Sequence, residues 1–262
     1  MPEKNMKAMV YDRYGPPSVI RLKEMAIPNP KPSEILIKIE ATTVTSVDVR
    51  MRSSDFPFHY WLLGRLVLGM LKPRKKILGH EFSGTVVKCG DNVKKFVTGD
   101  RVFGTTSGLL YGSYAQYIAI AEQRKGGVLE KIPGSISFSD AAALPIGGMT
   151  ALDLLLKGQI TKAKKVIIIG ACGSVGSFAL QIARAYGAEV TAVCSKKKFE
   201  LASKLGADRV LNYQDDTLYK VEFKYDLIFD TVAKYKKNRL RFLLNNNGKI
   251  VSTSSITAEK SS

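Results

Sequence analysis

The fold is decided by one stretch of the chain, Lys165-Val-Ile-Ile-Ile-Gly-Ala-Cys-Gly-Ser-Val-Gly176. Its β-branched residues 166–169 predict a short, fully buried strand of a parallel sheet. Glycines and small residues follow at once, and apolar residues then recur at helical spacing from Val175 to Ala183. A strand, a glycine-rich turn and a helix in this order form the context in which a glycine motif binds a dinucleotide.

The turn supplies the candidate phosphate-binding residues. Gly173 would let the backbone approach a pyrophosphate, Gly176 would let the helix pack closely on the strand, and the phosphates would lie on the N–H groups of the helix N-terminus. Ala171 stands where the G-x-G-x-x-G pattern has its first glycine, so a tight turn without a ligand stays open as the alternative. The predicted cofactor-binding residues of the loop are Gly170, Ala171, Cys172, Gly173, Ser174, Val175 and Gly176.

The second half of the chain continues this alternation. Further apolar strands are predicted at residues 189–194, 207–213, 226–230 and 248–253, with a short helix at 199–205. Strands alternating with helices predict an α/β fold, in which a doubly wound parallel sheet binds ligands at the carboxyl ends of its strands. This part of the chain is therefore interpreted as a Rossmann domain.

The end of the second strand indicates which dinucleotide is bound. A domain selective for NAD usually has Asp or Glu there, which accepts a hydrogen bond from the ribose 2′-hydroxyl. Here Ser195 and the lysines 196–198 follow the strand, and their hydroxyl and ammonium groups suit a 2′-phosphate, whereas Glu189 lies at the wrong end. We therefore predict NADPH as the cofactor, with Ser195, Lys197 and Lys198 among its ligands. A solvated lysine run at the start of the next helix is the alternative.

The first half of the chain is β-rich. Alternating apolar residues predict strands near residues 6–11, 19–25, 34–40, 82–90, 100–104 and 113–119. The change to an alternating pattern places a break near Pro133-Gly134, which gives domains 1–133 and 134–262. Residues 140–156 are predicted as two helical pieces broken at Pro145. They either bring Gly147 to Thr150 beside the nicotinamide or serve as a packed connector.

Composition excludes several classes of protein. The 262-residue chain is 45% hydrophobic and 24% charged, which is ordinary for a soluble globular protein. It has no basic-then-apolar signal at its N-terminus, and its longest apolar stretch, residues 60–71, is too short to span a bilayer. Its three cysteines have neither metal nor disulfide spacing. These features predict a cytoplasmic protein without a membrane partner.

The net charge of +17 is spread evenly along the chain. Residues 1–133 carry 21 lysines and arginines against 12 acidic residues, and residues 134–262 carry 19 against 11. A dedicated nucleic-acid arm would concentrate the charge, so we predict no specific nucleic-acid partner.

Short motifs run in one family's order over nearly the whole chain. They lie at residues 44–52, 77–84, 99–104, 141–151, 205–208 and 212–213, besides the glycine loop. Together they resemble the zinc-independent branch of the medium-chain dehydrogenase/reductase family, the quinone oxidoreductase and enone reductase group. The resemblance implies a GroES-like substrate domain before the Rossmann domain, with the active site in the cleft between them. It also implies that Tyr213 lies near the adenosine phosphate.

The zinc-dependent relatives differ from this chain at their metal ligands. Zinc needs about three converging ligands of the Cys, His or carboxylate type. The resemblance places Thr45 where those relatives have a cysteine ligand, and no cysteine occurs at residues 144–148, where they have another. His80 and Glu81 are retained, but one histidine and two nearby carboxylates make a poor zinc site. We therefore predict no metal and a hydrogen-bonded, structural His80.

Without a metal, the reaction needs hydrogen-bond donors where negative charge develops as hydride arrives. The resemblance places Thr45 on the floor of the substrate cleft, and Thr45 is the first candidate donor. Arg50 stands where many relatives have a tyrosine; it suits an oxyanion but cannot deliver a proton at neutral pH, so a proton would come from solvent or a ribose hydroxyl. Asp48 is predicted to orient the loop. His59, Tyr60 and Trp61 are predicted either to roof an apolar substrate or to form a packed surface helix.

Family members usually continue beyond the strand at residues 249–253 with a sixth strand that commonly forms the dimer seam. Here a polar tail, residues 256–262, follows, so we expect a shortened reductase with an exposed sheet edge, and a homodimer is left open. The leading interpretation is an NADPH-dependent reductase of a quinone or an α,β-unsaturated carbonyl. A catalytically silent dinucleotide-binding protein, a zinc alcohol dehydrogenase and a nucleic-acid binder are the alternatives.

Overall fold

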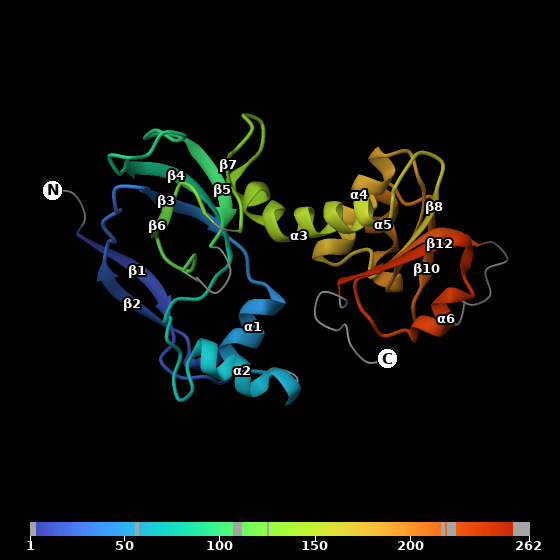
Figure 1. The fold of residues 1–262 in the computed structure, drawn as a ribbon, viewed down its shortest axis with the longest axis horizontal. Coiled ribbons are helices and arrows are strands. Elements are labelled where there is room, and N and C mark those ends of the chain that lie inside the picture. Colours follow the sequence, from blue (N-terminus) through green and yellow to red (C-terminus); the bar gives the residue numbers. More distant parts are fainter. Residues whose placement is uncertain are drawn as a thin grey trace. The chain divides into compact units, whose positions relative to one another are not determined.

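The computed structural model describes residues 4–55, 58–106, 112–124, 126–215, 218 and 224–253 (Figure 1). The chain forms two units, Met1–Pro145 and Ile146–Ser262, called unit 1 and unit 2 below. The boundary between the two units falls at Pro145. The sequence analysis predicted a domain break near Pro133-Gly134, and the division into a substrate domain 1–133 and a cofactor domain 134–262 stays a prediction. The side chains of His59 and Tyr60 and the polar tail at 256–262 lie outside the described residues.

Unit 1 is built on antiparallel strands. Its first two strands, β1 (Asn5–Val10) and β2 (Arg21–Ala26), pair with each other, and β1 alternates strictly between exposed and buried residues. Five further strands form one antiparallel sheet in the order β6-β3-β4-β5-β7. They are β3 (Glu34–Thr42), β4 (Glu81–Cys89), β5 (Arg101–Thr105), β6 (Tyr117–Ala121) and β7 (Leu129–Lys131).

The core of unit 1 lies on one face of this five-stranded sheet. Ile35 and Ile37 of β3 pack with Phe82 and Val86 of β4 and with Val102 of β5, and all five side chains are fully buried. Residues two apart on a strand share a face, so the alternating pattern of the sequence delivers them to the same side. The predicted β-rich first half is confirmed.

Unit 1 also contains helical elements between its strands, before α3 (Phe138–Lys157) begins. They are the 3-10 turn η1 (Pro17–Val19), α1 (Ser46–Ser53) and α2 (Phe58–Leu68), and α1 starts shortly after β3 ends. The loop before β4 passes close to α1 through Gly79, whose φ is 98°. A Cβ there would lie 2.1 Å from Ser113 Oγ, so only glycine fits. This loop leads directly to His80.

Unit 2, drawn from yellow to red in Figure 1, contains a parallel sheet in the order β10-β9-β8-β11-β12. Its strands are β8 (Lys165–Ile169), β9 (Glu189–Cys194), β10 (Arg209–Asn212), β11 (Tyr225–Asp230) and β12 (Leu244–Ser252). Its helices are α4 (Ser174–Ala185), the 3-10 turn η2 (Lys196–Lys198), α5 (Phe199–Lys204) and α6 (Lys237–Arg241). The chain runs outward from β8 to β10 and then returns to β11, so the topological switch point lies between β8 and β11.

Both faces of this sheet are covered. On β8, Ile168 packs into a cluster with Leu180 of α4, while its neighbour Ile167 packs into a second cluster with Leu240 of α6. Helices on both faces of a parallel sheet define a doubly wound fold, so the predicted α/β class with a Rossmann-type sheet is confirmed.

Helix α3 (Phe138–Lys157) corrects one prediction. The sequence predicted two helical pieces broken at Pro145, but α3 is a single helix of 20 residues that contains this proline. Buried residues hold both halves, with Ala141 and Ala142 before the proline and Leu154 and Leu155 after it. Their packing offsets the hydrogen bond that proline cannot make.

Helix α3 is also, among the described residues, the one helix long and apolar enough to cross a membrane by length and composition. One such helix is weak evidence of a membrane span, because the core helices of soluble proteins pass the same test. The predicted cytoplasmic location stays a prediction.

Candidate functional site

The glycine loop of unit 2 leaves one backbone position open. Gly170, with φ of 80°, turns the chain out of β8, and a Cβ there would lie 2.2 Å from Thr231 Oγ1. A Cβ on Gly176 would lie 2.2 Å from the Gly170 carbonyl oxygen, so Gly176 allows α4 to pack closely on the strand end. A Cβ on Gly173 would meet only that same carbonyl oxygen, at 3.3 Å. Gly173 therefore keeps the backbone accessible where a pyrophosphate would approach.

Ser174 and Val175, which lie between Gly173 and Gly176, form the start of α4. Gly173 is the N-cap and makes no side-chain cap, while Ser174 is exposed and Val175 is half-buried. The first N–H groups of a helix have no partner within the helix, and the helix dipole makes this end positive. The loop thus offers donors and a positive field to an anion, and its binding of a pyrophosphate stays a prediction.

The lysines after β9 lie against this loop. Lys198 Nζ donates a hydrogen bond to the Cys172 carbonyl oxygen at 3.2 Å, and the Cys172 thiol donates to the Lys198 carbonyl oxygen at 3.6 Å. Lys197 is exposed and Ser195 is half-buried. Glu189 lies at the opposite end of β9 and forms an ion pair with Arg209. The structure therefore joins the predicted pyrophosphate loop to the predicted 2′-phosphate segment.

Tyr213 lies beside the carboxyl end of β9, and Thr150 lies on α3. The Tyr213 N–H donates to the Cys194 carbonyl oxygen at 3.2 Å, which places this half-exposed tyrosine beside the end of β9. On α3, a Cβ on Gly147 would lie 2.8 Å from Ser174 Oγ, so α3 packs on the first turn of α4. Thr150 lies one turn further along α3 and is half-buried.

Sequence reasoning missed the residues at the end of β11. Thr231 Oγ1 donates to the Ile169 carbonyl oxygen at 2.9 Å, and Asp230 Oδ1 accepts hydrogen bonds from the N–H groups of Val232 and Ala233. Both residues lie at the switch point between β8 and β11, where doubly wound sheets bind ligands. The polar pair at the end of an apolar strand was the available signal.

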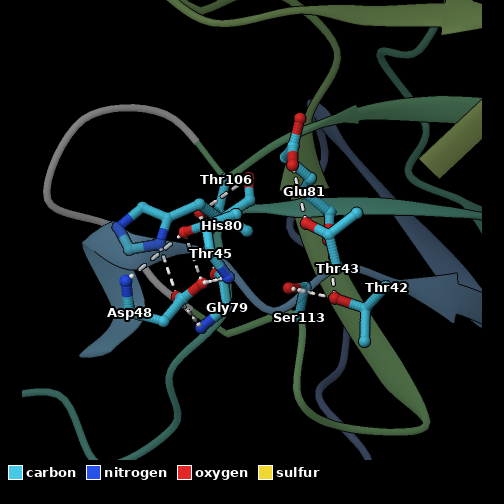
Figure 2. A network of polar contacts seen from close by, with 9 residues as sticks. All are labelled: Thr42, Thr43, Thr45, Asp48, Gly79, His80, Glu81, Thr106 and Ser113. Atoms are coloured by element: carbon cyan, nitrogen blue, oxygen red, sulfur yellow. Dashed lines mark hydrogen bonds and ion pairs between the residues drawn. The ribbon is translucent and has the colours of Figure 1, made fainter. Parts of the chain in front are cut away.

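In unit 1, Asp48 is the centre of a dense hydrogen-bond network (Figure 2). Asp48 Oδ2 accepts from the N–H and the hydroxyl of Thr45, at 2.9 and 2.7 Å. Asp48 Oδ1 accepts from the Gly79 N–H at 3.1 Å and lies 2.7 Å from His80 Nδ1. An ionised carboxylate can only accept, so Nδ1 carries the hydrogen in this contact. Although burial raises the pKa of Asp48, the hydrogen bonds from His80 and Thr45 lower it below its ordinary value.

This geometry gives Thr45 a structural role at the start of α1. Thr45 is the N-cap residue, and together with Asp48 it forms a capping box. Its hydroxyl donates to the Asp48 carboxylate and accepts from the Asp48 N–H. Arg50 lies two residues further along α1, exposed. The structure therefore brings Thr45 and Asp48 together and leaves Arg50 exposed on α1; their catalytic roles stay predictions.

Tyr114 lies close to Asp48 of this network, and sequence reasoning did not identify it. Its hydroxyl group is buried, and burial together with the nearby Asp48 carboxylate raises the pKa of Tyr114 far above its ordinary value. The tyrosine is therefore neutral at physiological pH. No pattern in the sequence linked Tyr114 to Asp48.

A second set of contacts ties the end of β3 to the start of β4. Thr42 Oγ1 donates to the Glu81 carbonyl oxygen at 2.7 Å and lies 2.8 Å from Ser113 Oγ. Thr43 Oγ1 donates to Glu81 Oε2 at 2.6 Å (Figure 2). The Glu81 side chain is buried here as a hydrogen-bonded acceptor.

The donor set of unit 1 does not fit a zinc ion. Beside His80, Thr45 offers a hydroxyl rather than a thiolate, and the Glu81 carboxylate accepts a hydrogen bond from Thr43. Within the part of the chain that the structure describes, no three His, Cys, Asp or Glu side chains converge on one point.

Comparison with known proteins agrees with the two halves of this fold. Residues 31–133 match the family model described as "Alcohol dehydrogenase GroES-like domain", and residues 174–261 match the one described as "Zinc-binding dehydrogenase". A chloroplast envelope quinone oxidoreductase homolog of Arabidopsis thaliana is 30% identical over 265 residues, which cover 96% of this chain and 75% of the relative. The chain belongs to the medium-chain dehydrogenase/reductase family.

Within this family, the chain is of the quinone oxidoreductase and alkenal reductase-like kind. An NADPH-dependent alkenal/one oxidoreductase of Arabidopsis thaliana chloroplasts is 32% identical over 243 residues, 89% of this chain and 59% of the relative. The structure of the quinone oxidoreductase from Coxiella burnetii has a TM-score of 0.82 at 29% identity, covering 95% of this chain and 75% of that one. These relatives make the family one of NAD(P)H oxidoreductases. The chain spans about 60% of the length of several curated relatives that it matches.

Proposed function

We propose that this chain is an NADPH-dependent, zinc-independent reductase that transfers hydride to a quinone or an α,β-unsaturated carbonyl. The observation that carries the proposal is the junction in unit 2 between the open glycine loop and the lysines after β9. The glycine loop suits a pyrophosphate. The segment 195–198 presents ammonium groups, rather than a carboxylate, where the adenosine ribose is expected.

The residues of the loop fit the dinucleotide for physical reasons. Gly173 has no side chain to block the pyrophosphate, and the α4 N-terminus adds N–H donors and positive potential. Lys197, Lys198 and Ser195 would hold the 2′-phosphate through charge-assisted hydrogen bonds. Tyr213 lies at the same strand ends, where an adenosine is expected. When bound, NADPH supplies the hydride.

In unit 1, Thr45 is the proposed donor to the oxygen on which negative charge develops. Its hydroxyl would have to turn away from Asp48, whose carboxylate would keep the Thr45 N–H, the Gly79 N–H and His80 as donors. Because Asp48 remains satisfied, the turn costs one hydrogen bond rather than a buried bare charge. Arg50 would add positive charge near the oxyanion, while the proton comes from solvent or a ribose hydroxyl.

The substrate class follows from the relatives. One relative is named for alkenals and enones, and another is named for quinones. All of these compounds are electron-poor conjugated systems that accept hydride. These names support a conjugated carbonyl as the substrate of this chain and do not distinguish among individual compounds.

Parallel titrations with NADPH and NADH, followed by cofactor fluorescence, test the proposal. We expect NADPH to bind at least tenfold more tightly than NADH, equivalent to about 1.4 kcal/mol. A panel of quinones and enones then measures turnover. Binding of neither cofactor would overturn the assignment, and tight NADPH binding without turnover on any compound would support a silent dinucleotide-binding protein instead.

A further inference from the structure

Helix α2 presents an apolar face to the outside of unit 1. The helix carries no acidic residue in its first turn, and Arg65 is its one Lys or Arg. Its described outward side chains are Leu62, Leu66 and Val67, which are 56%, 50% and 47% exposed. A surface helix of a soluble protein normally turns charged residues outward and apolar residues inward. The described part of α2 does the reverse.

The exposed face continues beyond the helix end. Met70 is 41% exposed and Leu71 is 91% exposed, and on the first turns of α2 Trp61 is 42% exposed. Together with Leu62, Leu66 and Val67 these exposed residues, all within residues 61–71, are called the α2 surface below. An exposed patch of large apolar side chains marks an interaction site.

Helix α2 is firmly attached to unit 1 on its other side. Leu68 is buried, the Tyr14 hydroxyl donates to the Gly69 carbonyl oxygen at 2.9 Å, and the Arg65 guanidinium lies 4.1 Å from the centre of the Tyr14 ring. Arg65 also stacks on Trp61, at 5.3 Å. The only positive charge of the helix is thus directed toward the protein, and the apolar residues are left outside by the packing itself.

A cluster of positive charges borders the α2 surface. Lys72, Arg74, Lys75 and Lys76 follow Leu71 directly and are all exposed. The Arg74 N–H donates to the Leu68 carbonyl oxygen at 2.8 Å, which folds this basic segment back beside the end of α2. Within the cluster, Lys76 forms an ion pair with Asp12 at 3.5 Å.

We propose that the α2 surface and the basic segment 72–76 bind the surface of an anionic lipid bilayer. Leu, Val, Met and Trp side chains would enter the boundary between headgroups and acyl chains, while the lysines and Arg74 contact acidic headgroups. A nucleic acid would satisfy the basic segment but would leave the leucines in water, so a bilayer fits both parts. This peripheral contact departs from the expectation of no membrane partner, and it does not depend on the proposed reductase activity.

The sequence offers a direct probe, because Trp61 is the only tryptophan of the chain. The full chain is mixed with vesicles of phosphatidylcholine alone or of phosphatidylcholine with phosphatidylserine. We expect the anionic vesicles to shift Trp61 emission to shorter wavelength, and lipids brominated on their acyl chains to quench it. Unchanged emission with anionic vesicles, or an equal shift with neutral ones, would overturn the proposal.

Co-sedimentation with the same vesicles tests the two components separately. Leu62→Glu with Leu66→Glu should abolish binding, whereas Leu22→Glu, at a site on β2 that is 61% exposed, should not. Lys72→Gln with Lys75→Gln should weaken binding by roughly fivefold per lysine, whereas Lys23→Gln with Lys94→Gln should change it little.

Gel filtration identifies the competing occupant. If the chain is a dimer that the two leucine substitutions separate, and vesicles bind neither form, the α2 surface is a contact between copies and the membrane proposal is wrong.

Discussion

The two candidate sites of this protein differ in how their polar groups are satisfied. In unit 1, the Asp48 carboxylate receives hydrogen bonds from Thr45, Gly79 and His80 and is almost fully buried. In unit 2, the first N–H groups of α4 have no partner within the helix, and Gly173 carries no side chain beside them. A group whose partners are all internal contributes to stability, whereas donors without internal partners are available to a ligand. Substitutions in the two sites should therefore separate into effects on stability and effects on cofactor binding.

The largest effect is expected for Gly176→Ala. The new Cβ would lie 2.2 Å from the Gly170 carbonyl oxygen and 2.9 Å from the Ala171 Cα, which are backbone atoms that cannot move aside cheaply. We expect a loss of about 3 kcal/mol or more of unfolding free energy, together with loss of NADPH binding. Chemical denaturation and cofactor fluorescence measure the two.

Gly173→Ala is its matched partner. Because its Cβ meets one atom at 3.3 Å, the variant should keep most of its stability and lose NADPH affinity by about tenfold or more. Unchanged affinity in this variant would show that the loop does not hold the pyrophosphate.

Asp48→Asn should lower stability and leave NADPH affinity unchanged, which is the opposite of the Gly173→Ala result. An amide has only one oxygen acceptor for donors that now share two carboxylate oxygens, so buried donors would be left unpaired. We expect a loss of about 3 kcal/mol in unfolding free energy and an unchanged NADPH dissociation constant. A weakened cofactor affinity at full stability would contradict the division between the two sites.

The Asp48 contribution should also depend on pH. Its pKa in the folded protein lies below the ordinary value of 3.8, so the stability that it adds is present above that value and is lost as the pH falls through the folded-state pKa. Comparing wild-type protein with Asp48→Asn removes the effect of other carboxylates. The stability difference between them should be constant from neutral pH to about pH 5 and narrow below about pH 4. A constant difference across the acid range would refute this account.

A smaller effect is expected when the lysines 196–198 are all replaced by alanine. If these ammonium groups pair with the 2′-phosphate, removing them should raise the NADPH dissociation constant by about tenfold, while the NADH constant changes by less than about threefold. The control is a triple alanine variant that removes the same amount of charge near the start of β8, at Lys162, Lys164 and Lys165. Equal losses for both cofactors would remove the basis for NADPH preference.

The smallest effect concerns Thr45. Thr45→Val removes the N-cap hydroxyl of α1 and should cost about 1 kcal/mol of stability, whereas Thr45→Ser should keep it. If the hydroxyl also serves the oxyanion, Thr45→Val should slow hydride transfer without changing NADPH affinity. An unaltered rate in a stable Thr45→Val protein would leave Thr45 with its capping role alone.

The prediction of secondary structure from the sequence succeeded where the pattern depended on residues close together in the chain. The run from Lys165 to Gly176 contains a strand, its turn and the start of its helix, and each depends on neighbours within a few residues. The close packing expected at Gly176 agrees with the 2.2 Å that would separate its Cβ from the Gly170 carbonyl oxygen, while the pyrophosphate role of Gly173 stays a prediction. Prediction failed at Pro145, since the local rule for proline ignores the packing that holds both halves of α3.

The sequence by itself determined the two kinds of sheet, the glycine loop and the lysines that follow β9, because periodicity and turn chemistry act over short stretches of chain. Only the tertiary structure decided that Asp48 bonds His80, 32 residues away, and that Arg65 turns inward and leaves the leucines of α2 outside. Those contacts depend on how strands and helices pack together, and spacing along the chain does not contain that information.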